Sequence, residues 1–227
     1  DKQRISITIN VNEGQRYLVT GVQFTGDYLG REEEFHSLVT IQPGNAYRAE
    51  DVANTQEAFT DRFGYFGYAF ARVESIPQID RNTGRVKVVL HAEPNRRVYV
   101  RRINISGNTR TRDEVIRREF RQLESAWYDG RRIKLSRDRV DRLGYFSEVD
   151  VDTQEVPGSP DQVDLTFTVK EKPTGALMLG ANFSSADRLS FSGSIKQDNI
   201  FGSGNYLGLE LNTSKSLRTI VLSSSPR

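Results

Sequence analysis

One five-residue sequence returns 80 residues later in this chain with a single residue changed. RFGYF occupies positions 62–66 and returns as RLGYF at 142–146. The similarity extends upstream, where LVTGVQFTGD at 18–27 lies opposite YVRRINISGN at 99–108, and each copy closes with an alternating strand that ends in proline. A repeat of this length predicts two structural units of the same fold, each about 80 residues long.

The repeat sets the expected domain boundaries. We expect one domain over 15–94 and a second over 95–173. ISITINVNEG at 5–14 alternates apolar and polar residues in the same way as the closing strands of both copies. We therefore expect residues 1–14 to end a preceding repeat, and the chain to be a fragment.

Each repeat reads as strand, helix, helix, strand, strand. Thr111 and Glu114 have the spacing of a capping box at the start of a helix. Gly64 and Gly144 follow the second helix, where a left-handed cap favours glycine. The second helices carry apolar stripes expected in the core: Val52, Phe59 and Phe63 in one copy, and Ile133, Ser136, Val140 and Leu143 in the other. The predicted class is α+β, with a three-stranded sheet covered by two helices.

The middle of each sheet is expected to be the last strand, because it forms a hairpin with the second strand and must also hold the first. The second strands, at 68–76 and 146–156, would then be exposed edges able to bind an unfolded chain by strand augmentation. The residues predicted to contact such a client are Tyr68, Phe70, Arg72, Glu74, Val149 and Val151. Alternatively, the charges of Arg72, Glu74, Asp150 and Asp152 block these edges.

The sequence changes character at Thr174. The last 54 residues hold five Lys/Arg and three Asp/Glu, half the charge density of the preceding 173. Segments of about ten residues alternate apolar and polar positions, as Leu177 and Leu179 do with Met178 and Gly180. Membrane-spanning β-strands have this pattern, but a soluble antiparallel sheet with one wet face produces it too.

These residues resemble one known family. The GD or GN after the first strand, the RLGYF after the second helix and the stretch VPGSPDQVDLTFTVKEKPTG are similar to the outer-membrane protein assembly factors of Gram-negative bacteria, in which POTRA domains precede a β-barrel. The resemblance implies that 1–14 end a preceding POTRA domain and that 15–94 and 95–173 are the two POTRA domains nearest the membrane. It also implies that 174–227 are the first strands of an antiparallel transmembrane β-barrel.

The same resemblance implies a function and a location. Such factors lie in the cell outer membrane with their POTRA domains in the periplasm, where they bind unfolded β-barrel proteins and insert them into the bilayer. The first barrel strand is then a seam that opens and templates client strands, and its expected residues are Gly175, Leu177, Leu179, Gly180 and Phe183. Alternatively, the two glycines serve only close packing.

Partners are implied as well. Accessory outer-membrane lipoproteins of the assembly complex would dock on the helix that contains Arg117, Arg118 and Glu119. Arginine pairs recur through the second repeat, where they could meet anionic headgroups or an acidic partner, or serve only solubility and local ion pairs. No nucleic-acid partner is expected, because the net charge is only +2 and no nucleic-acid-binding motif accompanies it.

Catalysis has little support in the sequence. The chain has no cysteine, and His36 and His91 lie on different elements outside any known catalytic motif. The glycines of GSGNYLG at 202–208 have the wrong spacing for a dinucleotide loop. We expect no enzymatic activity and no cofactor or metal. Two other classes stay open: a soluble periplasmic scaffold that binds peptides or proteins, and a two-partner secretion transporter.

Overall fold

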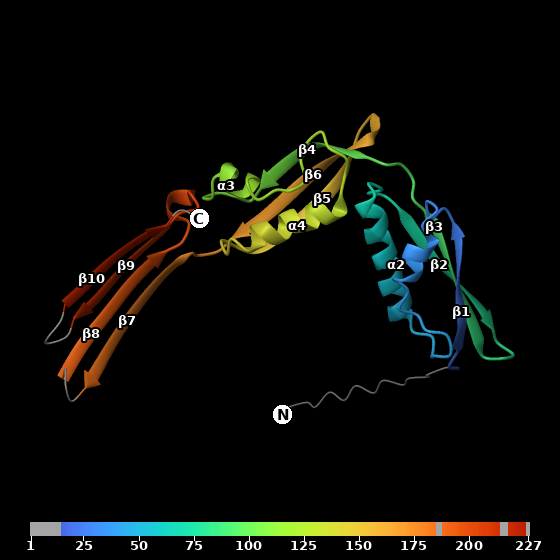
Figure 1. Ribbon diagram of the computed structural model, residues 1–227, viewed down its shortest axis with the longest axis horizontal. Helices are drawn as coiled ribbons and strands as arrows, with labels where there is room; N and C mark the ends of the chain where they lie inside the picture. Colours follow the sequence, from blue (N-terminus) through green and yellow to red (C-terminus); the bar gives the residue numbers. More distant parts are fainter. Residues whose placement is uncertain (1–14, 185–187, 214–217, 226–227) are drawn as a thin grey trace, which may run out of the picture. The chain divides into compact units, whose positions relative to one another are not determined.

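The structure is a computed structural model, and it describes residues 15–184, 188–213 and 218–225 (Figure 1). The strand expected in 1–14 lies outside the described residues. The chain divides into two compact units: the first comprises the described residues up to Phe63 together with Phe70–Asn95, and the second comprises Gly64–Ala69 and the residues from Arg96 onward. No helix in the described ranges is long and apolar enough to cross a membrane.

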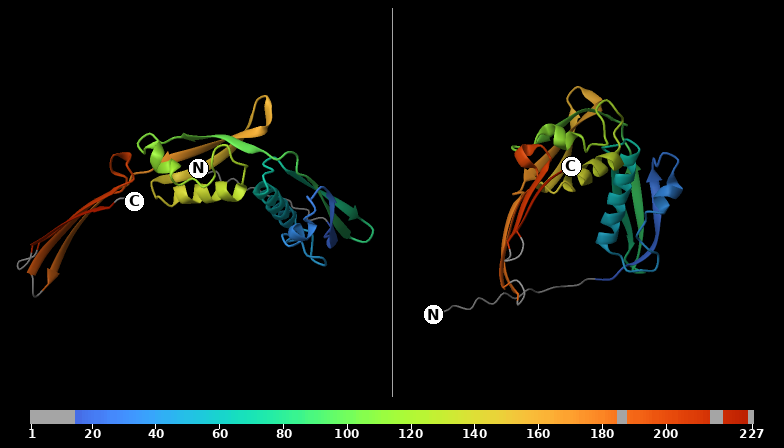
Figure 2. Two further views of the ribbon diagram at one scale, coloured as in Figure 1. Left: turned by 45° about the horizontal axis from the view of Figure 1, so that its top comes forward. Right: turned by 60° about the vertical axis from the view of Figure 1, so that its left-hand side comes forward.

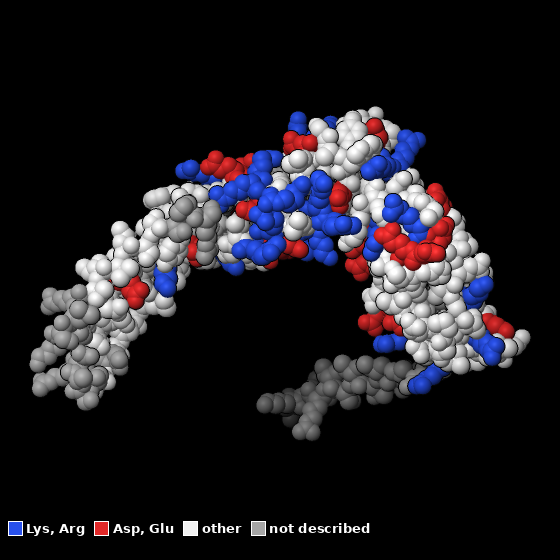
Figure 3. All heavy atoms as spheres, viewed as in Figure 1, with Lys and Arg blue, Asp and Glu red and all other residues white. Residues whose placement is uncertain are grey.

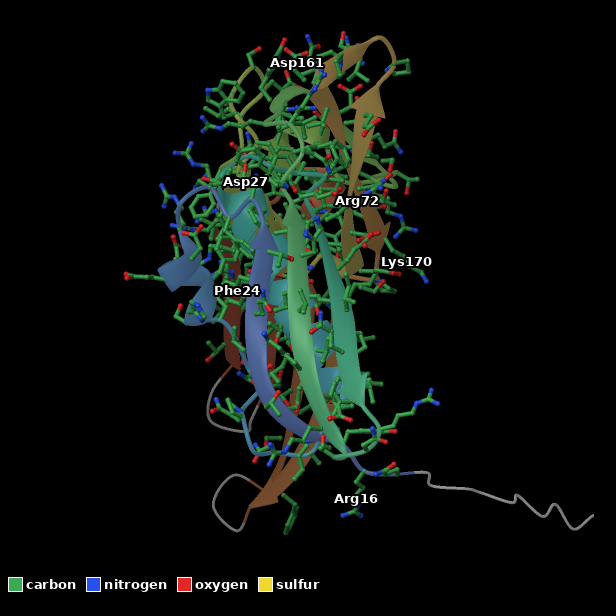
Figure 4. The ribbon with its side chains drawn as sticks, turned by 90° about the vertical axis from the view of Figure 1, so that its right-hand side faces the viewer. Arg16, Phe24, Asp27, Arg72, Asp161 and Lys170 are labelled. Carbon is green, nitrogen blue, oxygen red and sulfur yellow. The ribbon has the colours of Figure 1, made fainter. Side chains whose placement is uncertain are left out.

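The first repeat forms a three-stranded sheet with two helices. Its elements are β1 (Leu18–Gly26), α1 (Glu32–His36), α2 (Ala49–Tyr65), β2 (Arg72–Asp80) and β3 (Arg85–Glu93). The strand order is β1-β3-β2, with β3 parallel to β1 and antiparallel to β2 (Figure 4). The prediction that the last strand occupies the middle of the sheet is confirmed, as is the α+β class.

An aromatic core joins α2 to the sheet. Val52, Phe59 and Phe63 are fully buried, as the apolar stripe predicts, and the Phe59 ring packs edge-on against Tyr28 and Phe35. The Tyr28 hydroxyl donates to the carbonyl of Leu90 at 2.9 Å, and burial raises the pKa of Tyr28 to about 12. The buried phenol therefore holds the loop after β1 on the central strand.

The second repeat has the same topology. Its elements are β4 (Tyr99–Ser106), α3 (Asp113–Arg117), α4 (Gly130–Asp141), β5 (Phe146–Val156) and β6 (Ser159–Glu171), with the strand order β4-β6-β5. Ile133, Ser136 and Val140 are buried on α4 as predicted. The 80-residue repeat of the sequence thus corresponds to a repeat of strand order.

The predicted capping box at Thr111 is wrong. The short helix α3 is preceded by Arg112, and no side chain caps its first N–H groups. The Thr111 side chain is buried, and its hydroxyl oxygen accepts a hydrogen bond from the Asn199 amide at 2.8 Å. Thr111 therefore serves a contact that is distant in sequence.

The predicted left-handed cap is correct at Gly144 and wrong at Gly64. Gly144 has a φ of +76°, whereas Gly64 continues α2, which ends at Tyr65. The left-handed residue is Gly67, with a φ of +99°, and a Cβ there would lie 2.8 Å from atoms of the Arg97 side chain. The chain turn after α2 therefore comes three residues later than the repeat suggested.

The second unit also contains a four-stranded antiparallel sheet. Its strands are β7 (Gly175–Ser184), β8 (Arg188–Gln197), β9 (Tyr206–Thr213) and β10 (Arg218–Ser225), in the order β10-β9-β8-β7. Among the described residues of the second unit, no helix lies over either face of this sheet (Figures 1 and 2). β7 is an edge strand, because only β8 pairs with it among the described residues.

The connection between β8 and β9 is anchored to the second repeat. It contains a short 3-10 turn, η1 (Ile200–Gly202), whose Gly202 carbonyl accepts from the Arg112 N–H at 3.0 Å. The buried Tyr145 donates its hydroxyl to the Gly204 carbonyl at 3.0 Å. A Cβ at Gly202 would lie 1.9 Å from the Arg110 carbonyl oxygen, so only glycine allows this contact.

Glu171, the last residue of β6, holds the segment that receives this turn. Its carboxylate accepts from the Thr111 N–H at 2.7 Å, the Arg110 N–H at 3.1 Å and the Thr109 hydroxyl at 2.8 Å. Partial burial acts to raise the pKa of Glu171, but these hydrogen bonds outweigh it and hold the pKa below the usual value. The ionised carboxylate therefore stabilises the fold.

We predict that Glu171→Gln lowers the melting temperature of the second unit near neutral pH. Because the folded-state pKa is depressed, this contribution is present above the unfolded pKa, about 4.5, and is lost as the pH falls through the folded pKa. The difference between wild type and variant should therefore shrink on acidification. The fluorescence of Trp127, the only tryptophan of the chain, reports the melting.

Glu155→Gln, an exposed carboxylate on β5, is the matched control and should leave the melting temperature nearly unchanged. A difference at Glu171 that stays constant down to about pH 3, well below the usual glutamate pKa, would contradict this role.

Candidate functional site

The first strand of each three-stranded sheet has a partly covered outer edge. In the first repeat, the Val19 N–H donates to the Asn45 carbonyl at 2.9 Å, and the Gly44 N–H donates to the Val19 carbonyl at 2.8 Å. In the second repeat, the loop 125–128 makes the equivalent bonds to Val100. The chain therefore pairs these edges with its own loops.

Side chains extend this cover along β4. The Ile103 N–H donates to the Glu124 carboxylate at 2.8 Å, and the Arg117 guanidinium donates to the Ile103 carbonyl at 3.3 Å. These backbone groups are therefore already satisfied. An incoming strand would have to displace them before it could pair with β4.

The outer edge of β2 is free over part of its length. β2 begins at Arg72, so the predicted start at residue 68 is wrong: Tyr68 and Phe70 lie in the segment between α2 and the strand, and only Arg72 and Glu74 lie on the strand. Pro77 has no N–H to donate to a partner strand. The Gln56 side-chain amide on α2 donates to the Val73 carbonyl at 2.8 Å, so this backbone carbonyl of β2 already has a partner.

The outer edge of β5 is the most open. β5 is 11 residues long and contains no proline, and within the part of the chain that the structure describes no other segment hydrogen-bonds to this edge. Val149 and Val151 are half-buried beside Val169 and Phe167, while Asp150 and Asp152 are exposed. β5 is therefore the strand best suited to receive another strand.

The four-stranded sheet has one apolar face. Cross-strand register aligns its apolar residues into rows that continue across all four strands. One row is Leu177, Ile195, Leu209 and Leu222, and the next is Leu179, Gly193, Leu211 and Ile220. Leu177 is 65% exposed and Leu179 is 80% exposed, so neither packs into an aqueous core.

The opposite face is more polar. It is formed by the residues that alternate with those of the apolar face along each strand, among them Met178, Ser194 and Glu210. Phe191 and Ile220 of the apolar face are likewise exposed, and Leu209 is half-buried. The sheet thus presents one surface that water solvates well and one that it does not.

The five predicted seam residues all lie on the edge strand β7. Leu177, Leu179 and Phe183 share the apolar face. A Cβ at Gly180 would lie 2.7 Å from the Ser192 hydroxyl, and one at Gly175 would lie 2.7 Å from the Gln197 side-chain oxygen. Both glycines thus stand where neighbouring side chains approach closely.

Glu119 faces the interior of the second unit. One of its carboxylate oxygens lies 2.8 Å from Arg139 on α4, the other lies 3.7 Å from Arg118, and its side chain is 16% exposed. Arg117 and Arg118 are more exposed, and Arg117 also bonds Asp113 at 2.9 Å. Arginines gather over α3 and α4 on the face seen in Figure 3. Sequence reasoning missed Arg139, because nothing local links it to Glu119.

The histidines have structural contacts. The His36 ring stacks on Phe24 with ring centres 4.2 Å apart, and the His91 ring shares a hydrogen bond with the Thr25 hydroxyl at 3.0 Å. Among the described residues, no group of three or more His, Cys, Asp or Glu side chains is arranged to hold a metal ion.

Known proteins resemble this chain closely in its repeats. The POTRA model, described as surface antigen variable number repeat, matches residues 17–95 and 98–172. The outer membrane protein assembly factor BamA of Neisseria meningitidis serogroup B is 39% identical over 216 residues, which are 95% of this chain and 27% of the relative. BamA of Nitratidesulfovibrio vulgaris is 33% identical over 215 residues. The chain thus spans about a quarter of the length of these relatives.

Solved structures of BamA proteins are also similar to this chain. BamA from Haemophilus ducreyi lacking POTRA domains 1–3 superposes with a TM-score of 0.78 at 30% identity, over 92% of this chain and 39% of that one. The POTRA3–5 structure of Haemophilus influenzae BamA superposes with a TM-score of 0.67 at 32% identity, over 70% of this chain and 63% of that one. Because the family model matches both repeats and thereby most of the sequence, the chain belongs to the POTRA family.

Proposed function

We propose that this chain is the membrane-proximal part of an outer-membrane protein assembly factor, which binds unfolded β-barrel proteins and inserts them into the outer membrane. In this proposal, residues 1–14 end a preceding POTRA domain, 15–94 and 95–173 are periplasmic POTRA domains, and 174–227 begin the barrel. Support comes from the names of the relatives and from the exposed apolar face of β7–β10.

The apolar face is the observation that carries the proposal. The exposed apolar rows run across four neighbouring strands and form one continuous apolar surface, whereas an ordinary soluble protein exposes apolar residues singly. Each strand is also long enough, at eight to ten residues, to cross most of a hydrocarbon layer when tilted. Lipid is a solvent that suits such a face, while the polar face would line the barrel interior.

The edge strand β7 supplies the mechanism. Within a bilayer, each unpaired backbone group costs several kcal/mol, because no water is present to bond it. The free edge of β7 must therefore pair with the closing strand of its own barrel or with the strand of a client. Gly175 and Gly180 add little side-chain packing to this edge, so an exchange between the two partners costs less there.

In this proposal, an unfolded β-barrel protein first binds in the periplasm to the open strand edges of the POTRA domains. β5 is favoured because its outer groups are unpaired, and Val149 and Val151 would lie beside the bound strand. Arg72 and Glu74 on β2 offer a second, shorter edge, with Tyr68 and Phe70 in the segment that precedes it. Pairing through the backbone depends weakly on sequence, which suits a factor that handles many clients.

Accessory lipoproteins are assigned to the basic surface at the end of α3. Arg117 and Arg118 expose their guanidinium groups there, and Glu119 holds Arg118 and Arg139 in place. We propose that Arg117, Arg118 and Glu119 all contact the lipoprotein directly. Folding and insertion need no catalytic step in this scheme, because they require only the exchange of backbone hydrogen-bonding partners.

We predict that Leu179→Lys in the full-length protein prevents stable membrane insertion. A lysine on the lipid-facing side near mid-membrane costs about 2–4 kcal/mol. Met178→Lys is the matched control, because the neighbouring side chain faces the opposite surface of the sheet. The measurement is the fraction of heat-modifiable barrel in outer-membrane preparations. Equal effects of the two lysines would contradict the assignment of the lipid face.

We predict that clients cross-link to β5 and not to β4. The photoreactive residue p-benzoylphenylalanine is placed at Asp152 on the open edge strand, and in a matched variant at Arg102 on the covered one. Adducts with an unfolded barrel protein, resolved by electrophoresis, should form at position 152. Adducts of equal yield at both positions would show that the free edge does not direct client binding.

We predict that Glu119→Lys reduces the co-purification of lipoproteins with the full-length protein. The charge-swapped pair Glu119→Lys with Arg139→Glu should restore the internal ion pair and the melting temperature. If Glu119 also contacts the lipoprotein, co-purification stays low in the swapped protein. Full recovery would show that Glu119 acts only by positioning its neighbours.

A further inference from the structure

A cleft of about 580 Å³ opens beside the N-terminal end of α4. All of its lining residues belong to the second unit. Aromatic rings and arginines dominate the lining, which includes Arg97, Tyr99, Trp127, Tyr128, Asp129 and Arg132. Neither the seam strand β7 nor the open edge of β5 takes part in it, so the cleft is separate from the surfaces discussed above.

The aromatic wall of the cleft is rigid and partly exposed. Trp127 is 53% exposed, although hydrogen bonds hold the backbone on both sides of it. The Val100 N–H on β4 donates to the Ala126 carbonyl at 2.8 Å, and the Tyr128 N–H donates to the carbonyl of Val98, just before β4, at 3.0 Å. The Tyr99 ring meets Trp127 edge-on, with ring centres 6.2 Å apart. Large aromatic side chains that are exposed on a fixed backbone are typical anchors of binding sites.

The charge of the cleft is positive. The Arg97 guanidinium lies 4.5 Å from the centre of the Trp127 ring, and no carboxylate in the described part of the chain pairs with it. Asp129, the one acid in the lining, is already engaged: it accepts from the N–H groups of Arg131 and Arg132 at 2.9 and 3.3 Å and lies 3.5 Å from the Arg132 guanidinium. Arg97 is thus left with donors for an external acid.

We propose that this cleft binds an acidic peptide segment of a partner protein. A guanidinium stacked on an indole keeps its in-plane N–H groups free for the two oxygens of a carboxylate. The Trp127 and Tyr99 rings offer apolar surface to the residues that flank this carboxylate. The neighbouring edge of β4 is already paired, so side chains hold the peptide, and strand augmentation does not. The site is thus distinct from the client edges and does not depend on the membrane assignment.

The experiment uses the 227-residue chain in a neutral detergent and a blocked hexapeptide of alternating Glu and Leu as the probe. Because the chain has a single tryptophan, its emission reports events in this cleft. We expect the emission to change and saturate with this peptide and to stay constant with the corresponding Gln-Leu peptide. Arg97→Gln should weaken binding by about tenfold, which corresponds to about 1.4 kcal/mol.

Arg142→Gln is the matched control, because it removes an exposed arginine beyond the far end of α4 and should leave the affinity unchanged. Trp127→Phe, measured by titration calorimetry, keeps a ring in place and should bind with reduced affinity, so the test does not depend on one variant. Circular dichroism verifies that each variant is folded.

Three results would overturn the proposal. The Gln-Leu peptide could bind as well as the acidic one, Arg97→Gln could bind as tightly as wild type, or Trp127 could respond only to vesicles that contain phosphatidylglycerol. The last result would assign the cleft to an anionic lipid surface.

Discussion

The need of every strand edge to satisfy its backbone hydrogen-bonding groups governs this structure. β1 and β4 pair part of their outer edges with loops of their own repeat, and Glu124 and Arg117 complete the cover at Ile103. β5 and β7 have no such cover within the described residues. In water an open edge exchanges partners at little cost, whereas in hydrocarbon it cannot stay unpaired. Under the proposed function, the same hydrogen-bonding requirement would allow an unfolded client to bind at β5 and would require β7 to be paired in the membrane.

The repeated GYF sequence has a structural explanation. Its tyrosine is the last residue of α2 in the first copy and follows α4 in the second, and in both copies it contacts a segment that comes after its own repeat. Tyr145 is buried and bonds the Gly204 carbonyl of the β8–β9 turn, while Arg131 lies 5.0 Å from the centre of the Tyr65 ring within the second unit. The repeated tyrosine thus makes a contact beyond its own repeat in both copies, through its hydroxyl at Tyr145 and through its ring at Tyr65.

The acidic residues of the second unit hold particular backbone groups and arginines in place. Glu171 secures the segment that receives the β8–β9 turn, Asp129 caps α4, and Glu119 joins Arg118 to Arg139. Arginines without such partners, above all Arg97, keep their donors for other molecules. The net charge of +2 hides this division, because it counts paired and unpaired groups alike.

The sequence by itself determined which residues face the same way, since alternation and helical spacing are local properties. It therefore predicted the α+β repeats, the central position of β3 and β6, and the apolar face of β7–β10. Only the tertiary structure decided which distant groups meet. Thr111 bonds Asn199, Glu119 bonds Arg139, and the Arg97 side chain lies against the left-handed Gly67. Such partners are set by how separate segments pack, and periodicity along one segment carries no information about them.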